Sequence, residues 1–252
     1  MDGDADIAKV GALVADPARA RILLALGDGR ALPASVLAGE AGVAPSTASV
    51  HLAKLVDGGM LSVERHGRHR YFRVAGEPVA ELLEALARLS PPAPVRSLRA
   101  GTKASAVRFA RTCYDHLAGV LGTELMAALL ERQLLTGGDG VFAPGSAVGD
   151  RLAAPGFDLD YRLTERGVAE LGEFGIDFAG LRERRRPLIR YCVDWSEQRH
   201  HLGGALGAAL AERMFERGWV SRARGSRAVR VTDEGRQGLR ERFGLELKQL
   251  AS

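Results

Sequence analysis

The chain has 252 residues, of which 46% are hydrophobic and 26% are charged, and its formal net charge is +4. This composition is typical of a globular protein, and no apolar run reaches the roughly 18–20 residues that a membrane-spanning helix requires. Two cysteines exclude a disulfide framework, and the acidic start, MDGDADIAKV, is unlike a signal peptide. We therefore expect a cytoplasmic protein with no membrane partner, whose slight positive charge permits a polyanionic one.

The N-terminal third shows a run of predicted helices. Apolar residues recur with helical spacing through residues 6–26, with a break at Asp16 and Pro17. Proline suits the first turn of a second helix, and Asp16 is placed to cap it. A short helix, PASVLAGEAG, and a glycine-containing link then lead to PSTASVHLAKLVDGG. This order predicts a helix-turn-helix, with Leu52 and Leu55 in its core.

The next segment, MLSVERHGRHRYFRV, reads as two strands around a turn at Gly67. Four arginines and two histidines crowd into this hairpin. A solvated surface ribbon is one explanation for them. Directly after a helix-turn-helix, however, the arginines are better explained as contacts to phosphates and to the minor groove. The segment therefore predicts the wing of a domain that binds double-stranded DNA.

The second helix of the pair is expected to enter the major groove with its N-terminal residues facing base edges. Ser46 has the alternative role of a helix cap. Short hydroxyl side chains contact phosphates as readily as bases, so no operator sequence is predicted. The DNA-binding residues predicted in this helix and in the hairpin are Ser46, Thr47, Ser49, His51, Lys54, Arg65, Arg68 and Arg70.

These segments carry a family resemblance. In this order, DPARARILLAL, APSTASVHLAKLVDGGML and VERHGRHRYFRV resemble the ArsR/SmtB family of bacterial transcriptional repressors over roughly residues 5–90. The resemblance implies a homodimer, joined through the first helix and the helix PVAELLEALARL, and repression relieved by a small effector. The best-known members bind metal through paired cysteines before the recognition helix, or through Asp and His on the last helix. PASVLAGEAG and PVAELLEALARL contain neither set, so sensing is expected elsewhere.

A second region, residues 103–252, is expected to follow the domain of residues 1–90 and a proline-rich linker, residues 91–102. It contains an internal repeat, because HLAGVLGTELMAALLERQLL aligns with HLGGALGAALAERMFERGWV at an offset of 201 − 116 = 85 residues. In each copy an extended segment and a helix capped by Thr164 or Thr232 follow. The predicted fold is mainly α with small β-hairpins. Its C-terminal α+β domain has two helix–strand–helix modules, resembling degenerate winged helices, at about residues 113–175 and 192–245.

Glycines recur three residues apart in both predicted repeat helices, at positions 119 and 122 and at positions 204 and 207. Each costs about 1 kcal/mol relative to alanine inside a helix, so a structural reason is needed. Residues three apart share a helix face. We therefore expect the two repeat helices to cross at these glycines.

The stretch RYCVDWSEQRHHLGGALG has a structural and a functional interpretation. In the first, Asp194 and Glu197 form a capping box, Trp195 is core, and two exposed histidines lie in the second turn of a helix. In the second, the modules pair and bring thiols and imidazoles together, which suits Zn²⁺, Cu(I) or, for the thiols, arsenite-like species. Cys113 and His116, three apart, would share a helix face. The candidate metal ligands are Cys113, His116, Cys192 and His201.

Three roles remain open for the C-terminal region. An organic small molecule bound between the modules by apolar walls and a few polar anchors is the favoured effector. A metal or thiol-reactive species is the second, and a structural region for dimerisation or partner binding is the third; no cofactor is required. The predicted effector-binding residues are Phe109, Cys113, Tyr114, Asp115, His116, Cys192, Asp194, Trp195 and His201.

The sequence predicts a regulator and not an enzyme. Cysteine beside histidine can make a nucleophile, but no oxyanion loop, phosphate-binding loop or orienting triad accompanies the pair. The arginine-rich hairpin near residues 221–232 is either a second DNA contact or a solvated turn. We therefore expect a sequence-specific DNA-binding transcriptional regulator, a homodimeric repressor controlled by an effector in its C-terminal domain. The alternative is a winged-helix protein-interaction module without specific DNA binding.

Overall fold

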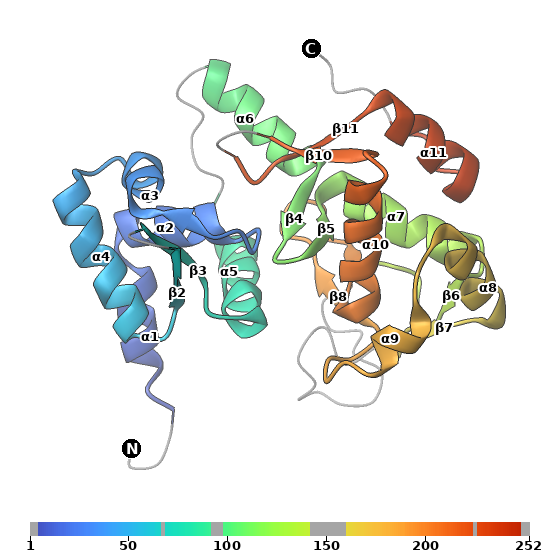
Figure 1. The fold of residues 1–252 in the computed structure, drawn as a ribbon, viewed down its shortest axis with the longest axis horizontal. Coiled ribbons are helices and arrows are strands. Elements are labelled where there is room, and N and C mark those ends of the chain that lie inside the picture. Colours follow the sequence, from blue (N-terminus) through green and yellow to red (C-terminus); the bar gives the residue numbers. More distant parts are fainter. Residues whose placement is uncertain (1–4, 67–68, 92–97, 142–159, 224–225, 248–252) are drawn as a thin grey trace. The chain divides into compact units, whose positions relative to one another are not determined.

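The computed structural model describes residues 5–66, 69–91, 98–141, 160–223 and 226–247. The chain divides into two compact units, Met1–Leu83 and Glu84–Ser252, hereafter unit 1 and unit 2 (Figure 1). The predicted turn of the N-terminal hairpin, at Gly67 and Arg68, lies outside the described residues. Within the described ranges, no helix combines the length and the apolar character that crossing a bilayer requires.

Unit 1 has the element order predicted for a winged helix-turn-helix, and the last helix extends from it into unit 2. Asp16 accepts hydrogen bonds from the backbone N–H groups of Ala18 and Arg19, both at 2.9 Å, and Pro17 occupies the first turn, so the predicted cap is confirmed. The elements are α1 (Ile7–Val14), α2 (Pro17–Leu26), β1 (Leu32–Pro33), α3 (Ala34–Ala41), α4 (Pro45–Asp57), β2 (Leu61–His66), β3 (His69–Val74) and α5 (Glu77–Leu89).

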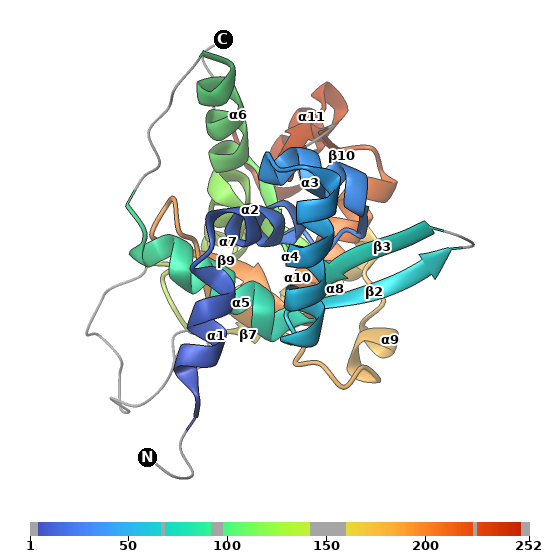
Figure 2. The ribbon, with the colours of Figure 1, turned by 90° about the vertical axis from the view of Figure 1, so that its left-hand side faces the viewer.

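A small antiparallel sheet in the order β1–β3–β2 packs beside these helices. Gly42, at a φ of 68°, ends α3 and allows the tight turn into α4. Leu52 and Leu55 of α4 are fully buried, as predicted, together with Phe72 and Val74 of β3. The β2–β3 hairpin projects beyond the helices of unit 1 as a wing (Figure 2). The predicted winged helix-turn-helix is therefore confirmed.

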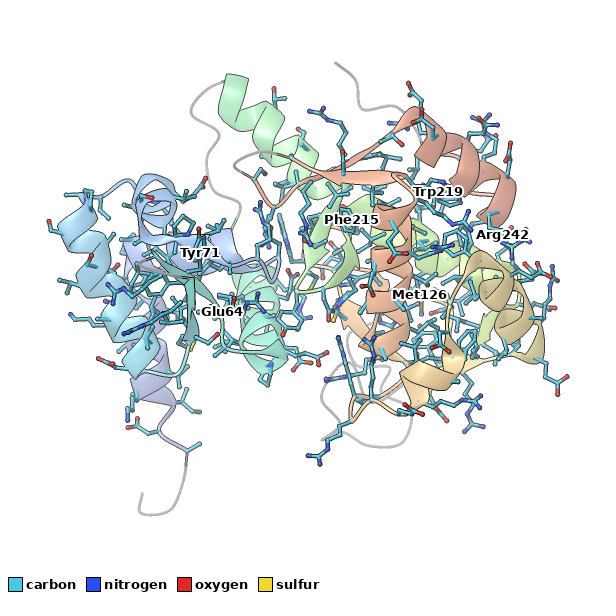
Figure 3. The ribbon with its side chains drawn as sticks, viewed as in Figure 1. Glu64, Tyr71, Met126, Phe215, Trp219 and Arg242 are labelled. Carbon is cyan, nitrogen blue, oxygen red and sulfur yellow. The ribbon has the colours of Figure 1, made fainter. Side chains whose placement is uncertain are left out.

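Unit 2 is an α+β region of helices and short antiparallel hairpins. Its core includes Met126 of α7 (Figure 3). Its elements beyond α5 are α6 (Leu98–Phe109), β4 (Arg111–Cys113), β5 (His116–Ala118), α7 (Gly119–Glu131), β6 (Leu135–Thr136), β7 (Arg162–Leu163), α8 (Glu165–Phe174), α9 (Phe178–Arg182), β8 (Arg190–Val193), β9 (His200–Gly203), α10 (Gly204–Glu216), β10 (Val220–Arg222), β11 (Val229–Val231) and α11 (Asp233–Phe243).

The internal repeat of unit 2 is visible in the order of its elements. The first copy runs β4, β5, α7, β6, β7, α8, and the second runs β8, β9, α10, β10, β11, α11. Thr164 and Thr232 cap α8 and α11, each accepting a hydrogen bond from a glycine N–H, as predicted. The expected helix–strand–helix module was wrong in one respect. Each copy begins with a β-hairpin, so the observed order is hairpin, helix, hairpin, helix.

The repeat helices begin later than predicted, because their first residues are glycines with positive φ. Gly119 has a φ of 76° and Gly204 a φ of 73°, which a helix cannot continue through. His116 and His201 therefore lie on strands β5 and β9, and the prediction that they lie on helices was wrong. The expected exposure of His200 and His201 was also wrong, since both are buried.

The glycines inside the repeat helices fit each helix against the other copy's hairpin. The helix α7 packs on β9, and α10 packs on β5. A Cβ atom at Gly122 would lie 3.4 Å from the Cβ of His201, and one at Gly207 would lie 3.3 Å from the Cβ of His116. The two repeat helices were predicted to cross each other at these glycines. This prediction was wrong, because each helix packs at its glycines against a strand of the other copy. The glycines make room for the two histidine strands.

This packing predicts that Gly122→Ala destabilises unit 2. The new Cβ would lie 2.5 Å from the carbonyl oxygen of Leu117, which is backbone and cannot move aside. We expect a loss of about 1–3 kcal/mol in the free energy of unfolding, measured by urea denaturation. The control Gly172→Ala, on α8, places its Cβ in open space and should not be destabilising. Equal stability of the two variants would contradict the close packing.

Candidate functional site

The helix α4 presents most of its predicted DNA-binding residues to solvent. Ser46, Thr47, Ser49 and Lys54 are exposed. His51 is half-buried, with its Nδ1 3.8 Å from a carboxylate oxygen of Asp16, so it is the least available of the set. The N-cap of α4 is Ala44, and the alternative role of Ser46 as a cap is therefore wrong.

The wing carries two exposed arginines in an unusual arrangement. Arg65 and Arg70 are directly opposite each other in the β2–β3 register. Like charges in cross-strand register are destabilising, so this pair favours a ligand that supplies negative charge. Arg73 of the same hairpin instead pairs with Glu64 at 3.0 Å. The predicted contact Arg68 lies outside the described residues.

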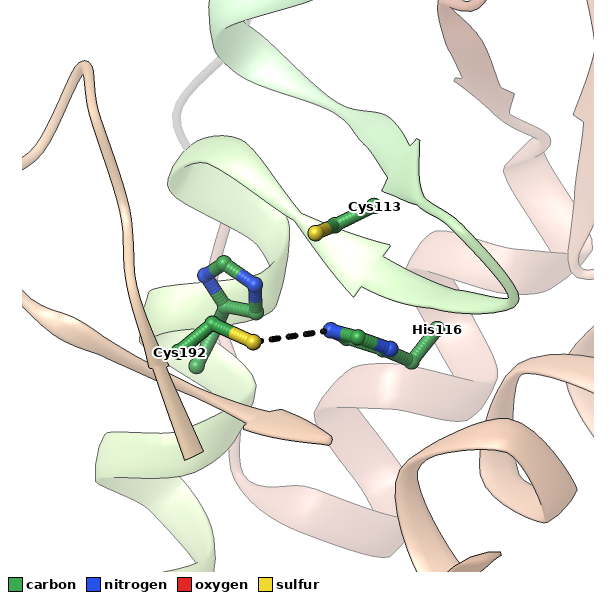
Figure 4. A group of neighbouring side chains, drawn as sticks. Cys113, His116 and Cys192 are labelled. Atoms are coloured by element: carbon green, nitrogen blue, oxygen red, sulfur yellow. Dashed lines mark hydrogen bonds between the residues drawn. The ribbon is translucent and has the colours of Figure 1, made fainter. Parts of the chain in front are cut away.

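In unit 2, four side chains from the two repeat copies converge into one cluster, Cys113, His116, Cys192 and His201, hereafter the Cys₂His₂ cluster. Their ligand atoms all lie within 4.8 Å of one another. Each copy supplies a cross-strand pair, since Cys113 faces His116 in the β4–β5 hairpin and Cys192 faces His201 in β8–β9. Figure 4 shows the two thiols and the His116 ring directed toward one another.

The residues of the cluster lie on β-hairpins, whereas the sequence predicted helices around its histidines. Cys113 and His116 were expected to share one face of a helix, and this is wrong. They meet across a tight turn in which Tyr114 has a φ of 58°. Asp194 was expected to cap a helix. It does accept hydrogen bonds from the N–H groups of Ser196 and Glu197, but a turn into β9 follows it.

Each histidine of the cluster has a carboxylate beside its Nδ1 atom. Nδ1 of His116 lies 3.2 Å from Asp115, and Nδ1 of His201 lies 3.3 Å from Asp194. Nε2 of His116 is 3.6 Å from the sulfur of Cys192, as the dashed line in Figure 4 marks. The ring of His201 is buried beside the Cys113 thiol, and its Nε2 makes no hydrogen bond within the described residues. Since each Nδ1 lies beside a carboxylate, Nε2 is the nitrogen that each histidine has left for the cluster.

A buried ion-pair network surrounds the cluster. Arg111, on β4, is fully buried and donates to Asp194 at 2.8 Å, and its guanidinium is 3.6 Å from Glu84. Arg227 also lies 3.6 Å from Glu84. The second carboxylate, Asp115, pairs with Arg186 on the outer side of the site. Asp194 accepts a further hydrogen bond, of 2.7 Å, from the N–H of Gly119 at the start of α7.

The local electrostatics explain the protonation of these groups. The hydrogen bond with Cys192, together with burial, raises the pKa of the Cys113 thiol well above its ordinary value. Burial alone would raise the pKa of Asp194, but His201, Arg111 and the N–H of Gly119 hold it well below its usual range. Cys113 therefore keeps its proton until a metal ion displaces it, whereas Asp194 stays ionised.

The donor set fits a tetrahedral metal ion. Zinc bonds of about 2.3 Å to sulfur and about 2.0 Å to nitrogen place tetrahedral ligands roughly 3.3–3.8 Å apart. The separation of Cys192 and His116 already lies in this range, and the widest pairs in the cluster would have to close by about 1 Å. Two thiolates and two imidazoles are a donor set typical of structural zinc sites. The Cys₂His₂ cluster could therefore hold one ion.

The other predicted effector-binding residues do not line the cavity found among the described residues. Phe109 belongs to the hydrophobic core, Tyr114 is half-buried in the β4–β5 turn, and Trp195 stacks on Arg111 at 4.7 Å. This cavity of about 190 Å³ lies between α9, α10 and the link that joins α8 to α9, and none of these predicted residues lines it. Its lining residues are Gly175, Ile176, Asp177, Gly180, Leu181, Arg184, Ala209, Glu212, Arg213 and Glu216.

Sequence reasoning missed the arginines and the glutamate around the cluster. Arg111 and Arg190 stand two residues before Cys113 and Cys192, so the repeat did contain a signal for Arg111. Glu84 and Arg186 lie outside the repeat copies and gave no comparable signal.

Comparisons with known proteins agree with the fold of unit 1. A family model described as a helix-turn-helix domain matches residues 14–64. The uncharacterized HTH-type transcriptional regulator YdfF of Bacillus subtilis (strain 168) is 41% identical over 231 residues, which is 92% of this chain and 94% of YdfF. HTH-type transcriptional regulator Rv0324 of Mycobacterium tuberculosis (strain ATCC 25618 / H37Rv) is 40% identical over 77 residues, 30% of this chain and 33% of Rv0324.

One solved structure has a domain of similar sequence. It is the homodimeric winged helix-turn-helix DNA-binding domain, fragment 1–100, of Mb0332 from Mycobacterium bovis, described as a possible ArsR-family transcriptional regulator. Its sequence is 34% identical, covering 35% of this chain and 88% of the fragment. The TM-score is 0.30. The identity with YdfF over nearly the whole length of both chains, together with the helix-turn-helix match, shows that the chain is a DNA-binding transcriptional regulator and not an enzyme, and that it belongs to the ArsR family of winged helix-turn-helix regulators.

Proposed function

We propose that this ArsR-family regulator is a homodimeric repressor whose affinity for DNA is controlled by a thiophilic metal or metalloid ion bound at the Cys₂His₂ cluster. The observation that carries the proposal is the convergence of two thiols and two imidazoles from the two repeat copies. Buried cysteines and histidines in one cluster are the ligands that soft and borderline ions select. An organic effector, which the sequence favoured, has less support, because the predicted residues do not line the cavity described above.

The proposed DNA contacts are the exposed residues of α4, in the major groove, and the arginines of the wing. Replacing Arg65 with alanine should weaken binding to every DNA sequence and reduce the slope of log affinity against log salt by about 1, because one phosphate contact is lost. Fluorescence anisotropy at several salt concentrations measures both effects.

The matched control for Arg65→Ala is Arg73→Ala on the same hairpin. The guanidinium of Arg73 is already paired with Glu64, so its loss should change the slope less. An Arg65→Ala variant with the salt slope of the unmodified protein would remove Arg65 from the phosphate contacts.

Exposed apolar residues on α1 support the proposed dimer. None of the eight residues of α1 is buried within the chain, and Ile7 has 78% of its surface exposed. Such a helix face is typical of one that packs against a partner. The homodimeric Mb0332 domain gives the same expectation for this chain.

The rival function is a winged helix that binds a protein without recognising specific DNA. Titration with DNA from the chain's own upstream region separates the two functions. Nanomolar, salt-sensitive binding supports the repressor, whereas micromolar binding to any DNA supports the rival.

A reporter under that upstream region tests the effector in cells. Zinc, cadmium, copper or arsenite should relieve repression by the unmodified protein and fail to do so for the double variant Cys113→Ser/Cys192→Ser. An identical response from both proteins, or no response to any of these ions, would overturn control through the Cys₂His₂ cluster.

A further inference from the structure

We infer that the Cys₂His₂ cluster selects a divalent ion of the zinc type, four-coordinate through two thiolates and two Nε2 atoms, with Asp115 and Asp194 fixing the histidines. This inference rests on the proposed function, and it goes beyond it by naming the charge and the coordination of the ion. The charge balance around the site, the carboxylate beside each Nδ1 atom and the equal contribution of the two repeat copies support this assignment.

In the described ion pairs around the cluster, the carboxylates and guanidiniums balance one another. Three carboxylates, of Glu84, Asp115 and Asp194, face three guanidiniums, of Arg111, Arg186 and Arg227, in the contacts described above. These pairs therefore leave no net charge to neutralise a charged metal centre. An unbalanced charge in a buried site is strongly unfavourable. The metal centre should then be neutral, or nearly so.

With both cysteines as ligands, the metal centre is neutral only if the ion carries a charge of +2. Two thiolates and two ligating imidazoles, which must be neutral to bind a metal, carry a charge of −2 together. A divalent ion displaces the protons of the thiols and any proton on the ligating nitrogens to solvent, and the resulting centre is neutral. Cu(I) bound by the same two thiolates would leave a charge of −1 beside Asp194, which is itself fully buried. The charge balance therefore favours a divalent ion.

The two histidines argue for nitrogen ligands and against a site made of sulfur alone. In metal sites, a ligating histidine typically donates its other ring N–H to a carboxylate, which fixes the tautomer and raises the basicity of the ligating nitrogen. Nδ1 of His116 makes this hydrogen bond with Asp115, and Nδ1 of His201 has the carboxylate of Asp194 in the same place, at 3.3 Å. An arsenite-like species held by the thiols would not use these histidines. Their matched carboxylates therefore point to an S₂N₂ site.

The sequence of the repeat supports the same conclusion. Both copies contain Cys-x-Asp, as Cys113 with Asp115 and Cys192 with Asp194, and the Asp of each copy contacts the His of that copy. Each copy thus brings one thiol, one imidazole and one carboxylate to the site. Half of a tetrahedral centre comes from each copy, and the fourfold ligand count follows from the duplication.

The direct test is metal binding by the full-length, reduced and chelator-treated protein. Zn²⁺, Co²⁺, Cu(I) and arsenite are titrated separately under anaerobic conditions, with the metal per chain and the affinity measured by chelator competition. We expect one Zn²⁺ or Co²⁺ per chain and the absorption of tetrahedral, thiolate-bound Co²⁺. His116→Ala should abolish that absorption. His200→Gln should retain it, because His200 neighbours the site but is bonded to the hydroxyl of Tyr161 at 2.8 Å.

Two results would overturn the inference. One is stoichiometric binding of Cu(I) or arsenite, in preference to Zn²⁺, that His116→Ala leaves unchanged. The other is a reduced protein that binds none of these ions. Cys-dependent relief of repression by arsenite or copper alone would overturn the divalent S₂N₂ site and leave the proposed function standing. Absence of a Cys-dependent response to every ion would overturn the proposed function itself.

The role of the carboxylates has its own test in Asp115→Asn. Asp115 is a positioning residue at the edge of the site, 36% exposed, so its replacement should leave the fold intact. We expect Zn²⁺ affinity to fall about 10- to 100-fold, with the tetrahedral Co²⁺ spectrum retained, because the four ligands are unchanged. An unchanged affinity would show that Asp115 does not support His116.

Discussion

The double variant Cys113→Ser/Cys192→Ser should lose Zn²⁺ affinity by at least about 10³-fold. Closed zinc sites bind their ion with about 10–16 kcal/mol, shared among four ligands, and this variant removes two of them. The serine hydroxyls that remain are poor ligands for zinc. Elemental analysis after purification without a histidine tag gives the metal per chain, and chelator competition gives the affinity.

Thermal unfolding gives an independent measure of the same loss. An ion that binds the folded chain at 100 times its Kd stabilises it by about 2.7 kcal/mol. Zinc should therefore raise the Tm of the unmodified protein, and removal of zinc by a chelator should lower it again. The double variant should show neither change while keeping its DNA binding in the absence of metal. One zinc per chain in the double variant would contradict the assigned ligands.

The second large effect is expected at Arg111. Arg111→Met should lower the free energy of unfolding of unit 2 by about 3–5 kcal/mol, because the buried carboxylates of Asp194 and Glu84 would lose their shared guanidinium. Denaturant unfolding followed by tryptophan fluorescence measures this, since Trp195 and Trp219 are the two tryptophans of the chain and both lie in unit 2.

The control for Arg111→Met is Arg162→Met. Arg162 pairs with Asp160, and both side chains are largely exposed, so solvent and salt screen the pair. This variant should unfold like the unmodified protein. A loss at Arg111 no larger than the change at Arg162 would show that the buried network does not stabilise unit 2.

Unit 1 was predictable because its signals are local. The cap at Asp16, the apolar spacing around Leu52 and Leu55, and the hairpin that ends at Val74 each depend on a few neighbouring residues. Local periodicity and capping therefore predicted the winged helix-turn-helix with its correct element order.

Unit 2 shows where such reasoning fails. The repeat left open whether the cysteines and histidines meet. They do meet, yet the predicted helices around His116 and His201 are strands. Two backbone conformations decide where the strands end, a φ of 58° at Tyr114 and a φ of 76° at Gly119. The spacing of apolar residues does not predict either of them. A helical pattern that starts with a glycine at positive φ looks the same in sequence as one that continues through it.

The network around Asp194 could not be predicted for a different reason. Its partners are far apart in sequence, since Arg111 is 83 residues away and Gly119 is 75. The packing of each repeat helix on the other copy's hairpin brings them together, and that packing depends on small residues such as Gly122 and Gly207. The sequence indicated that these glycines had a structural reason, but not which element they would contact.

The most direct test of control by the Cys₂His₂ cluster is the DNA affinity of one protein in two metal states. The full-length protein, chelator-treated or loaded with one equivalent of Zn²⁺, is titrated into fluorescent DNA from its own upstream region. We predict that zinc weakens binding by about 5- to 150-fold, the usual range of coupling between two sites, and that Cys113→Ser/Cys192→Ser removes the difference. Equal DNA affinities with zinc stoichiometrically bound would contradict the proposal.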